Sequence, residues 1–255
     1  MKKKILDKAV ICVIIALLFA GCSRFAYYDS KTSQEPTTSE TSLNAEIAKP
    51  VILRIGIEEN REGEQVFTID IEDYIQRYNS FFRGDYGCDF FSPVSEWQCY
   101  RRDSGIHSDH EMKFYYFQLD EQVYSLPTVA VYVPTNADHI QEITINFDEH
   151  SFTESGFQLY KEICRYTMKV FFPDLTDEEQ SSICSQIFSL GNQNVLSSEE
   201  WYDTGAIPCV LFYRDGIGIY PYFAIGDWER FCVIPVTEDI LSNFTQKGTE
   251  IHEIP

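Results

Sequence analysis

Ligand-type side chains gather at one place in the sequence, the stretch Gly-Ile-His-Ser-Asp-His-Glu over residues 105–111. These residue types could hold a zinc ion, which in catalytic sites takes three converging protein ligands and leaves one position open. On a strand, however, His107 and Asp109 point to one side and His110 points to the other. We therefore predict a polar turn that leads into a strand at this place, with no metal ion and no cofactor.

The sequence contains none of the short motifs that identify common catalytic sites. It has no G-x-S-x-G elbow, Walker loop, H-E-x-x-H pair or dinucleotide-binding glycine fingerprint. A pair of catalytic carboxylates cannot be selected among 40 acidic residues without knowing which of them lie together. Any catalytic site would have to be assembled from residues that are distant in the sequence.

The charge balance excludes one class of partner. The 255 residues include 40 Asp and Glu against 20 Lys and Arg, which gives a formal net charge of −20. Nucleic-acid binding depends on Lys and Arg side chains that neutralise phosphates. We therefore predict no nucleic-acid partner, and we interpret the acidity as solvation of the surface.

The N-terminus has the features of an export signal. Four lysines precede an apolar run of twelve residues from Ala9 to Ala20, which as a helix reaches about 18 Å and falls short of the ~30 Å hydrocarbon core. The run ends in Leu-Phe-Ala-Gly-Cys22, which resembles the lipobox of bacterial lipoproteins. The resemblance implies that residues 1–21 are a signal peptide, that Cys22 is acylated, and that the protein is held extracytoplasmically on the outer leaflet of the cell membrane.

The composition divides the remaining chain. Residues 22–50 are predicted to be a tether, because the stretch 29–49 contains eight Ser or Thr and no apolar period. We expect one globular domain over residues 51–245 and a polar tail over residues 246–255. Removal of the signal peptide takes away four lysines and one aspartate, so the formal charge changes from −20 to −23.

Cysteines are the second group of residues with chemical potential. Cys12 would leave with the signal peptide, and six cysteines remain in the exported domain: Cys88, Cys99, Cys164, Cys184, Cys209 and Cys232. An even number in an exported domain favours disulfides. We favour Cys164 with Cys184, because they are equidistant from a helical turn near residue 174, and Cys88 with Cys99. Cys209 and Cys232 are then the third pair, and free buried thiols are the alternative.

Aromatic residues make up 15% of the chain and occur in runs. With only three Met in the sequence, we expect aromatic side chains to fill much of the core. Adjacent residues of a strand face opposite ways, so at least one ring of a run such as residues 115–117 leaves the core side. The candidates for a recognition surface are Tyr115 or Tyr116, Trp201, Tyr220 and Tyr222.

The hydrophobic periodicity predicts a mixture of strands and helices. Alternating apolar residues predict strands at 51–57, 66–69, 112–119, 128–133, 141–147, 207–213, 217–224 and 230–236. Asp70 is placed to cap a helix that Gly84 would close. Capping boxes at Ser151–Glu154 and Thr176–Glu179 open two further helices, and Pro173 separates them. The segment 85–108 is expected to be irregular.

These patterns predict an α+β fold, an antiparallel sheet with a helical hairpin packed on one face. Two small α+β lobes divided near residue 150 are the alternative. For the function we favour a membrane-anchored binding module whose partner is an extracellular protein, a peptide or a wall component. An extracytoplasmic hydrolase with a site assembled from distant residues is the alternative, and a solute-binding lipoprotein is the third hypothesis.

Overall fold

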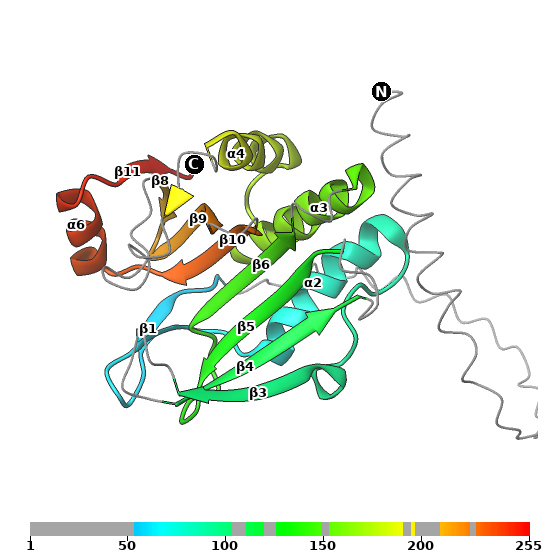
Figure 1. Ribbon diagram of the computed structural model, residues 1–255, viewed down its shortest axis with the longest axis horizontal. Coiled ribbons are helices and arrows are strands. Elements are labelled where there is room, and N and C mark those ends of the chain that lie inside the picture. The colour runs from blue at the N-terminus through cyan, green and yellow to red at the C-terminus, as the bar shows by residue number, and fades with distance from the viewer. Residues whose placement is uncertain are drawn as a thin grey trace, which may run out of the picture. The chain divides into compact units, whose positions relative to one another are not determined.

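Strands from both halves of the chain form one large sheet in the computed structural model of the protein (Figure 1). The structure describes residues 54–103, 111–119, 126–148, 153–190, 195–196, 210–224 and 228–255. The predicted signal peptide, the tether, and the individual residues Cys22, His107, Asp109, His110, Trp201 and Cys209 lie outside these described residues.

The strand order of the large sheet is β11-β8-β9-β10-β6-β5-β4-β3, and β7 also pairs with β9. Neighbouring strands are antiparallel, except that β11 is parallel to β8 and β7 is parallel to β9. The strands are β3 (Gln98–Asp103), β4 (Glu111–Gln118), β5 (Thr128–Pro134), β6 (Glu142–Asp148), β7 (Val195–Leu196), β8 (Val210–Arg214), β9 (Ile217–Ala224), β10 (Trp228–Pro235) and β11 (Glu250–Glu253).

The pairing of β6 with β10 joins the two halves of the sheet. Six consecutive residue pairs, from Ile143 opposite Val233 to Asp148 opposite Trp228, connect strands on either side of residue 150. Residues 54–255 accordingly cluster as one unit. The predicted α+β class and its predominantly antiparallel sheet are confirmed, whereas two lobes with separate sheets are not what the structure shows.

The predicted helical hairpin is formed by α3 (Glu154–Phe171) and α4 (Asp177–Leu190). Its turn contains Pro173, as expected. The Thr176 hydroxyl accepts a hydrogen bond from the Glu179 amide at 3.2 Å, while Glu179 Oε2 accepts one from the Thr176 amide at 2.8 Å. This reciprocal arrangement is the predicted capping box. Helix α3 begins later than predicted, because Thr153, and not Ser151, is its N-cap.

Helix α2 (Ile71–Tyr86) begins at the predicted cap. Asp70 Oδ1 accepts a hydrogen bond from the Asp73 amide at 2.7 Å. The helix continues through Gly84 and ends at Gly87, whose φ of 77° is the left-handed conformation that glycine adopts at little cost. Before α2, the strands β1 (Ile57–Glu59) and β2 (Gln65–Phe67) form an antiparallel hairpin, and β1 begins at the last residue of the strand predicted at 51–57.

The core between the helices and the sheet is rich in aromatic side chains, as predicted. Tyr78 of α2 lies 5.7 Å from Tyr166 of α3 between ring centroids, and Phe147 of β6 lies 5.6 Å from Tyr160 of α3. Ile143 and Ile145 face the same core and are fully buried. The large aromatic rings supply the apolar burial that stabilises this layer.

Two regions contain more regular structure than the sequence predicts. The segment expected to be irregular contains a short 3₁₀ helix, η1 (Val94–Glu96), and strand β3. The residues beyond Val236 form helix α6 (Glu238–Gln246), and the predicted polar tail forms strand β11, which pairs with β8. Strand β8 begins at Val210 and turns into β9 at Asp215 and Gly216, both with positive φ.

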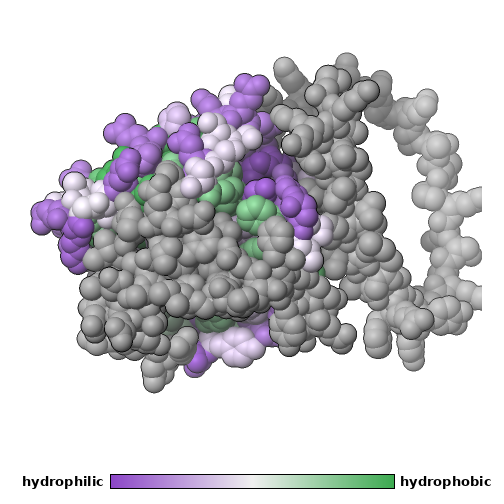
Figure 2. All heavy atoms as spheres, turned by 45° about the horizontal axis from the view of Figure 1, so that its top comes forward, coloured by the Kyte–Doolittle hydropathy of each residue, from purple (hydrophilic) through white to green (hydrophobic). Residues whose placement is uncertain are grey.

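The described surface is mainly hydrophilic. Figure 2 shows hydrophilic residues over most of the described surface on the side it presents, with smaller hydrophobic areas between them. None of the helices in the described ranges combines the length and the apolar character needed to cross a membrane.

Candidate functional site

The large sheet has two faces, and alternate residues of each strand belong to each face. One face packs against α3 and α4 and contributes Ile143, Ile145 and Phe147 to the core. Figure 1 shows α2 and α3 behind strands β4, β5 and β6. We call the opposite side the aromatic face, and we define it by Tyr100, Phe114, Tyr116 and Tyr132.

Aromatic rings follow one another across β3, β4 and β5 on the aromatic face. Tyr100 is directly opposite Phe114, which in turn is opposite Tyr132. The ring centroids of Tyr100 and Phe114 are 6.4 Å apart, and those of Phe114 and Tyr132 are 4.9 Å apart. Tyr116 stacks on Phe114 at 5.8 Å. These contacts make one continuous and partly exposed aromatic surface.

Tyr100 is the solvent-exposed end of this surface. It is 53% exposed, and it is the one large hydrophobic residue classed as exposed in the described part of the chain. Its hydroxyl donates a hydrogen bond of 2.6 Å to Gln98 Oε1 on the same face, which restrains the ring. A restrained, exposed tyrosine provides a large contact area at a small entropic cost on binding.

Ionisable side chains continue the aromatic face on β6 and β10. Glu142 is opposite Tyr132, and Arg230 is opposite Asn146 on the neighbouring strand. Burial raises the pKa of Glu142 to about 7, because the nearby positive charge of Arg230 offsets only part of the desolvation. Burial also raises the pKa of Tyr132, and the negative charge of Glu142 adds to this shift. The face therefore changes its charge near neutral pH.

A buried hydroxyl on the same face has no hydrogen-bond partner among the described residues. Thr128 lies opposite Gln118 on one side and Asn146 on the other, and it is 5% exposed. Its Oγ1 makes no hydrogen bond in the described structure. A buried polar atom without a partner costs about 1–3 kcal/mol.

Helix α6 covers the aromatic side of the sheet at its other end. Tyr220 and Cys232 are buried with Leu211 and Val236, and side chains of α6 including Ile240 and Phe244 pack against them. On β5 and β6, the residues Thr128, Ala130 and Thr144 of this side are also buried. The accessible part of the aromatic face is therefore its β3 and β4 end, at Tyr100, Phe114 and Tyr116.

The structure places the predicted recognition aromatics differently from one another. Tyr116 lies on the aromatic face, whereas Tyr115 lies on the opposite face beside Cys99. The prediction for Tyr220 is wrong, because this side chain is buried beneath α6. The backbone of Tyr222 lies opposite Arg230, and the structure does not describe its side chain.

The predicted disulfides are not formed among the described cysteines. Cys184 is a buried free thiol whose Sγ lies 3.3 Å from Met168 Sδ, so the bond to Cys164 is absent. Burial raises the pKa of the Cys184 thiol to about 12. Cys99 is a free, exposed thiol on β3 and forms no bond to Cys88. Cys232 is buried in the sheet between Thr144 and Tyr220, and Cys209 lies outside the described residues.

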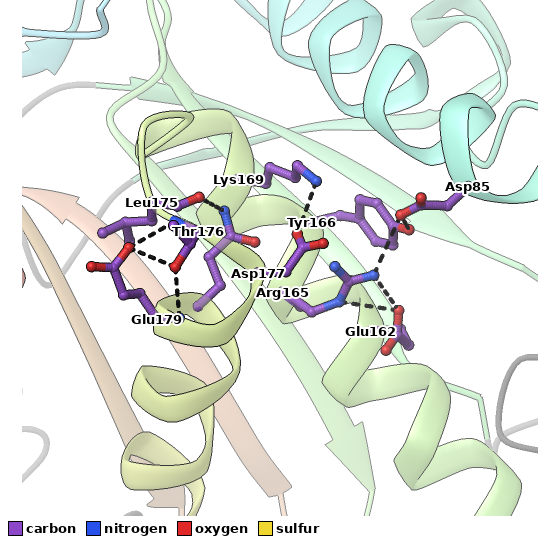
Figure 3. Close-up of polar contacts among 10 residues, drawn as sticks. Asp85, Glu162, Arg165, Tyr166, Lys169, Leu175, Thr176, Asp177 and Glu179 are labelled. Carbon is purple, nitrogen blue, oxygen red and sulfur yellow. Dashed lines mark hydrogen bonds and ion pairs between the residues drawn. The ribbon is translucent and has the colours of Figure 1, made fainter. Parts of the chain in front are cut away.

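A second polar cluster joins the end of α2 to α3 (Figure 3). Arg165 donates to Glu162 Oε2 at 2.8 Å, and its guanidinium lies 3.8 Å from Asp85 Oδ2. The Tyr166 hydroxyl donates to the same Asp85 oxygen. Although burial opposes it, the Glu162 carboxylate raises the pKa of Arg165. Because these groups bond to one another, we interpret the cluster as a structural connection between helices and not as a ligand site.

The described residues offer no metal centre. No group of three or more His, Cys, Asp or Glu side chains in the described ranges is arranged to hold a metal ion. Among the side chains that the structure describes, the aromatic face instead combines apolar rings with the Glu142 carboxyl group, the Arg230 guanidinium and the Thr128 hydroxyl. This combination can bind a partly polar ligand without covalent chemistry.

Sequence reasoning missed most of the residues that form the aromatic face. Tyr100, Phe114 and Tyr132 lie one after another only because β3, β4 and β5 pair in this register. The alternation of apolar and polar residues along β4 and β5 could have indicated Phe114 and Tyr132, because each is a large aromatic residue on the side of its strand that faces away from the core. Glu142 and Arg230 lie 88 positions apart in the sequence and approach through the β6–β10 pairing.

Comparisons with protein-family models, with curated proteins and with solved structures find no significant match for this chain.

Proposed function

We propose that this chain is a membrane-anchored extracytoplasmic lipoprotein whose folded domain binds a polypeptide partner through the aromatic face. The observation that carries the proposal is the row of Tyr100, Phe114 and Tyr132 beside the ionisable pair of Glu142 and Arg230. Aromatic residues and arginine are the types most enriched in the energetic centres of protein interfaces.

The binding proposal can be tested by selecting peptides from a displayed random library on the purified mature chain. We expect enriched peptides whose binding is weakened at least tenfold by Tyr100→Ala or Tyr116→Ala, because each substitution removes contact area from the face. Phe81→Ala on α2 is the matched control, since Phe81 is a partly buried aromatic residue outside this face. Peptides that bind all variants equally, or a library without any enrichment, would contradict the proposal.

The lipid anchor is supported by the lipobox-like sequence that ends in Cys22. Cys22→Ala should release the chain into the medium or leave an unprocessed precursor, whereas Cys12→Ala should leave processing and anchoring intact. Fractionation and intact mass of the membrane-bound form distinguish these results. Unchanged maturation and anchoring of the Cys22→Ala chain would refute lipidation at this residue.

A further inference from the structure

Helix α6 is docked on the sheet by a small apolar contact. The helix has nine residues, and none of them is fully buried. It packs on the buried cluster of Leu211 through Ile240, Leu241 and Phe244, which are only partly buried themselves. No hydrogen bond or ion pair between described residues joins a side chain of α6 to another element. A helix of this length is marginal in water by itself, so α6 depends on this apolar contact.

The chain is fixed more firmly on both sides of α6. Before the helix, Val236 is fully buried, and its N–H donates to the Gly216 carbonyl at 2.7 Å. After the helix, β11 pairs with β8 over four residues, and Ile254 beyond it is buried. Arg214 also donates to the Pro255 carbonyl at 2.6 Å. The helix is thus a weakly docked segment between two anchored strands, β10 and β11 (Figure 1).

The side chains beneath α6 belong to the same row of the sheet as Tyr116. In register across the strands, Tyr116 is opposite Ala130, and Ala130 is opposite Thr144. Thr144 is opposite Cys232, which is opposite Tyr220. Residues in one such row share a face of the sheet. Removal of α6 would therefore add a second tyrosine to the side of the sheet that bears the aromatic face.

We propose that α6 is a lid: the segment from Thr237 to Gly248 leaves the sheet by local unfolding and uncovers Tyr220 and Cys232, while β10 and β11 stay paired. Segments with few buried apolar contacts are the ones that open before the rest of a domain. The role of the lid rests on the binding function proposed above. A partner that contacts Tyr220 in addition to Tyr116 binds the open form and shifts the population toward it.

Cys232 is a natural probe of the opening. It is a free thiol that is 1% exposed, and burial raises its pKa well above the ordinary value, so it reacts only after it is uncovered. Cys184 is the reference, because it is a free thiol buried between α3 and α4. The test exposes the folded chain to excess maleimide without denaturant and measures each labelled peptide by mass spectrometry. We expect Cys232 to be labelled at least tenfold faster than Cys184.

Substitution of Phe244 shows whether α6 controls this rate. Phe244→Ala removes part of the contact between α6 and the sheet, so it should accelerate labelling of Cys232 at least fivefold and leave Cys184 within twofold. Phe81→Ala is the matched control, since Phe81 is a partly buried aromatic residue on α2, and it should leave the ratio of the two rates unchanged. One common rate for both thiols, or a Cys232 rate that Phe244→Ala does not change, would overturn the lid.

Hydrogen exchange shows whether β11 stays in place when α6 opens. The Leu241 amide donates to the Thr237 carbonyl within the lid, and the Ile254 amide donates to the Tyr213 carbonyl at 3.0 Å. We expect Leu241 to exchange faster than Ile254, and equal exchange would mean that the whole C-terminal segment leaves together, contrary to the lid. Neither measurement needs a partner. A failed peptide selection therefore refutes the binding function and leaves the movement standing, whereas a closed α6 refutes the lid and leaves binding at Tyr116 standing.

Discussion

Glu142 is a carboxyl group at the centre of a sheet, with a pKa raised by burial to about 7. Its pKa in the unfolded chain is near 4.5, so the folded state binds the proton more tightly than the unfolded state. The free energy of unfolding must then fall as the pH rises through the interval between these two values. Arg230 moderates this loss, but it does not remove it.

Replacing Glu142 by glutamine should remove this pH dependence. Relative to the unmodified chain, we expect Glu142→Gln to gain about 2 kcal/mol in unfolding free energy between pH 5 and pH 8. Urea denaturation of both proteins at each pH measures the difference. Glu178→Gln, at an exposed position of α4, should show no such gain. A pH-independent difference for Glu142→Gln would mean that this carboxyl is not desolvated as described.

Substitution of Arg165 tests how much a partly buried ion pair contributes to the free energy of unfolding, in comparison with an exposed pair. Its side chain is 17% exposed and serves both Glu162 and Asp85, whereas Arg83 is 59% exposed in its pair with Asp89. Arg165→Met should cost about 3 kcal/mol, because it leaves two acidic groups without their cation. Arg83→Met should cost less than about 1 kcal/mol. Equal costs in chemical denaturation would contradict the structural role assigned to the cluster.

At the level of single residues, periodicity predicted the core better than the candidate site. The alternation over residues 141–147 predicts one common face for Ile143, Ile145 and Phe147, and all three are buried there. Tyr220 has the same sequence signature as Tyr116, yet α6 covers it. One strand's pattern indicates which way a side chain points, but it carries no information on which distant helix will cover it.

At the level of elements, the signals that predicted boundaries well are local ones. The Asp70 cap, the Thr176 capping box and Pro173 each act within a single turn of helix, and each lies where expected. Strand β11 and helix α6 were missed because their residues are mostly polar on the exposed side. What stabilises them is tertiary contact, such as Ile251 and Phe244 against the Leu211 cluster.

The end of α2 provides a direct test at the same scale. A side chain at Gly84 would meet no atom within 4 Å, so Gly84→Ala should stabilise the protein by about 0.5–1 kcal/mol as a helix-interior change. Gly87→Ala should instead destabilise it by about 1 kcal/mol, because φ there is positive. Thermal unfolding of the two variants measures both effects. If Gly84→Ala instead destabilised the protein and Gly87→Ala stabilised it, the helix would end at Gly84, as the sequence alone predicts.

At the level of the whole molecule, the sequence predicts the class but not the order of strands. The α+β class follows from the alternation of strand and helix patterns. The pairing of β6 with β10, which lie about 80 residues apart, is a long-range contact that the sequence pattern of neither strand indicates. The aromatic face exists only because this order places β3, β4, β5 and β6 side by side.

A sheet that is continuous across residue 150 also predicts how the domain unfolds. Because β6 and β10 share six residue pairs, unfolding of one half of the sheet exposes the hydrogen-bonding edge and the buried face of the other half. We therefore expect a single cooperative transition in urea. Fluorescence of Trp97 beside β3, with Trp201 and Trp228 replaced by phenylalanine, should report the same midpoint as far-ultraviolet circular dichroism.

Two variants make this test sharper, because they weaken opposite ends of the sheet. Val133→Ala on β5 and Leu211→Ala on β8 each remove a buried aliphatic side chain and should cost about 1–4 kcal/mol. In a single cooperative unit, either substitution lowers the midpoint seen by Trp97 and by circular dichroism together. Independent lobes would give a Trp97 transition that responds to Val133→Ala and ignores Leu211→Ala. That result would mean that the strands of the candidate site unfold independently of the part of the sheet beneath α6.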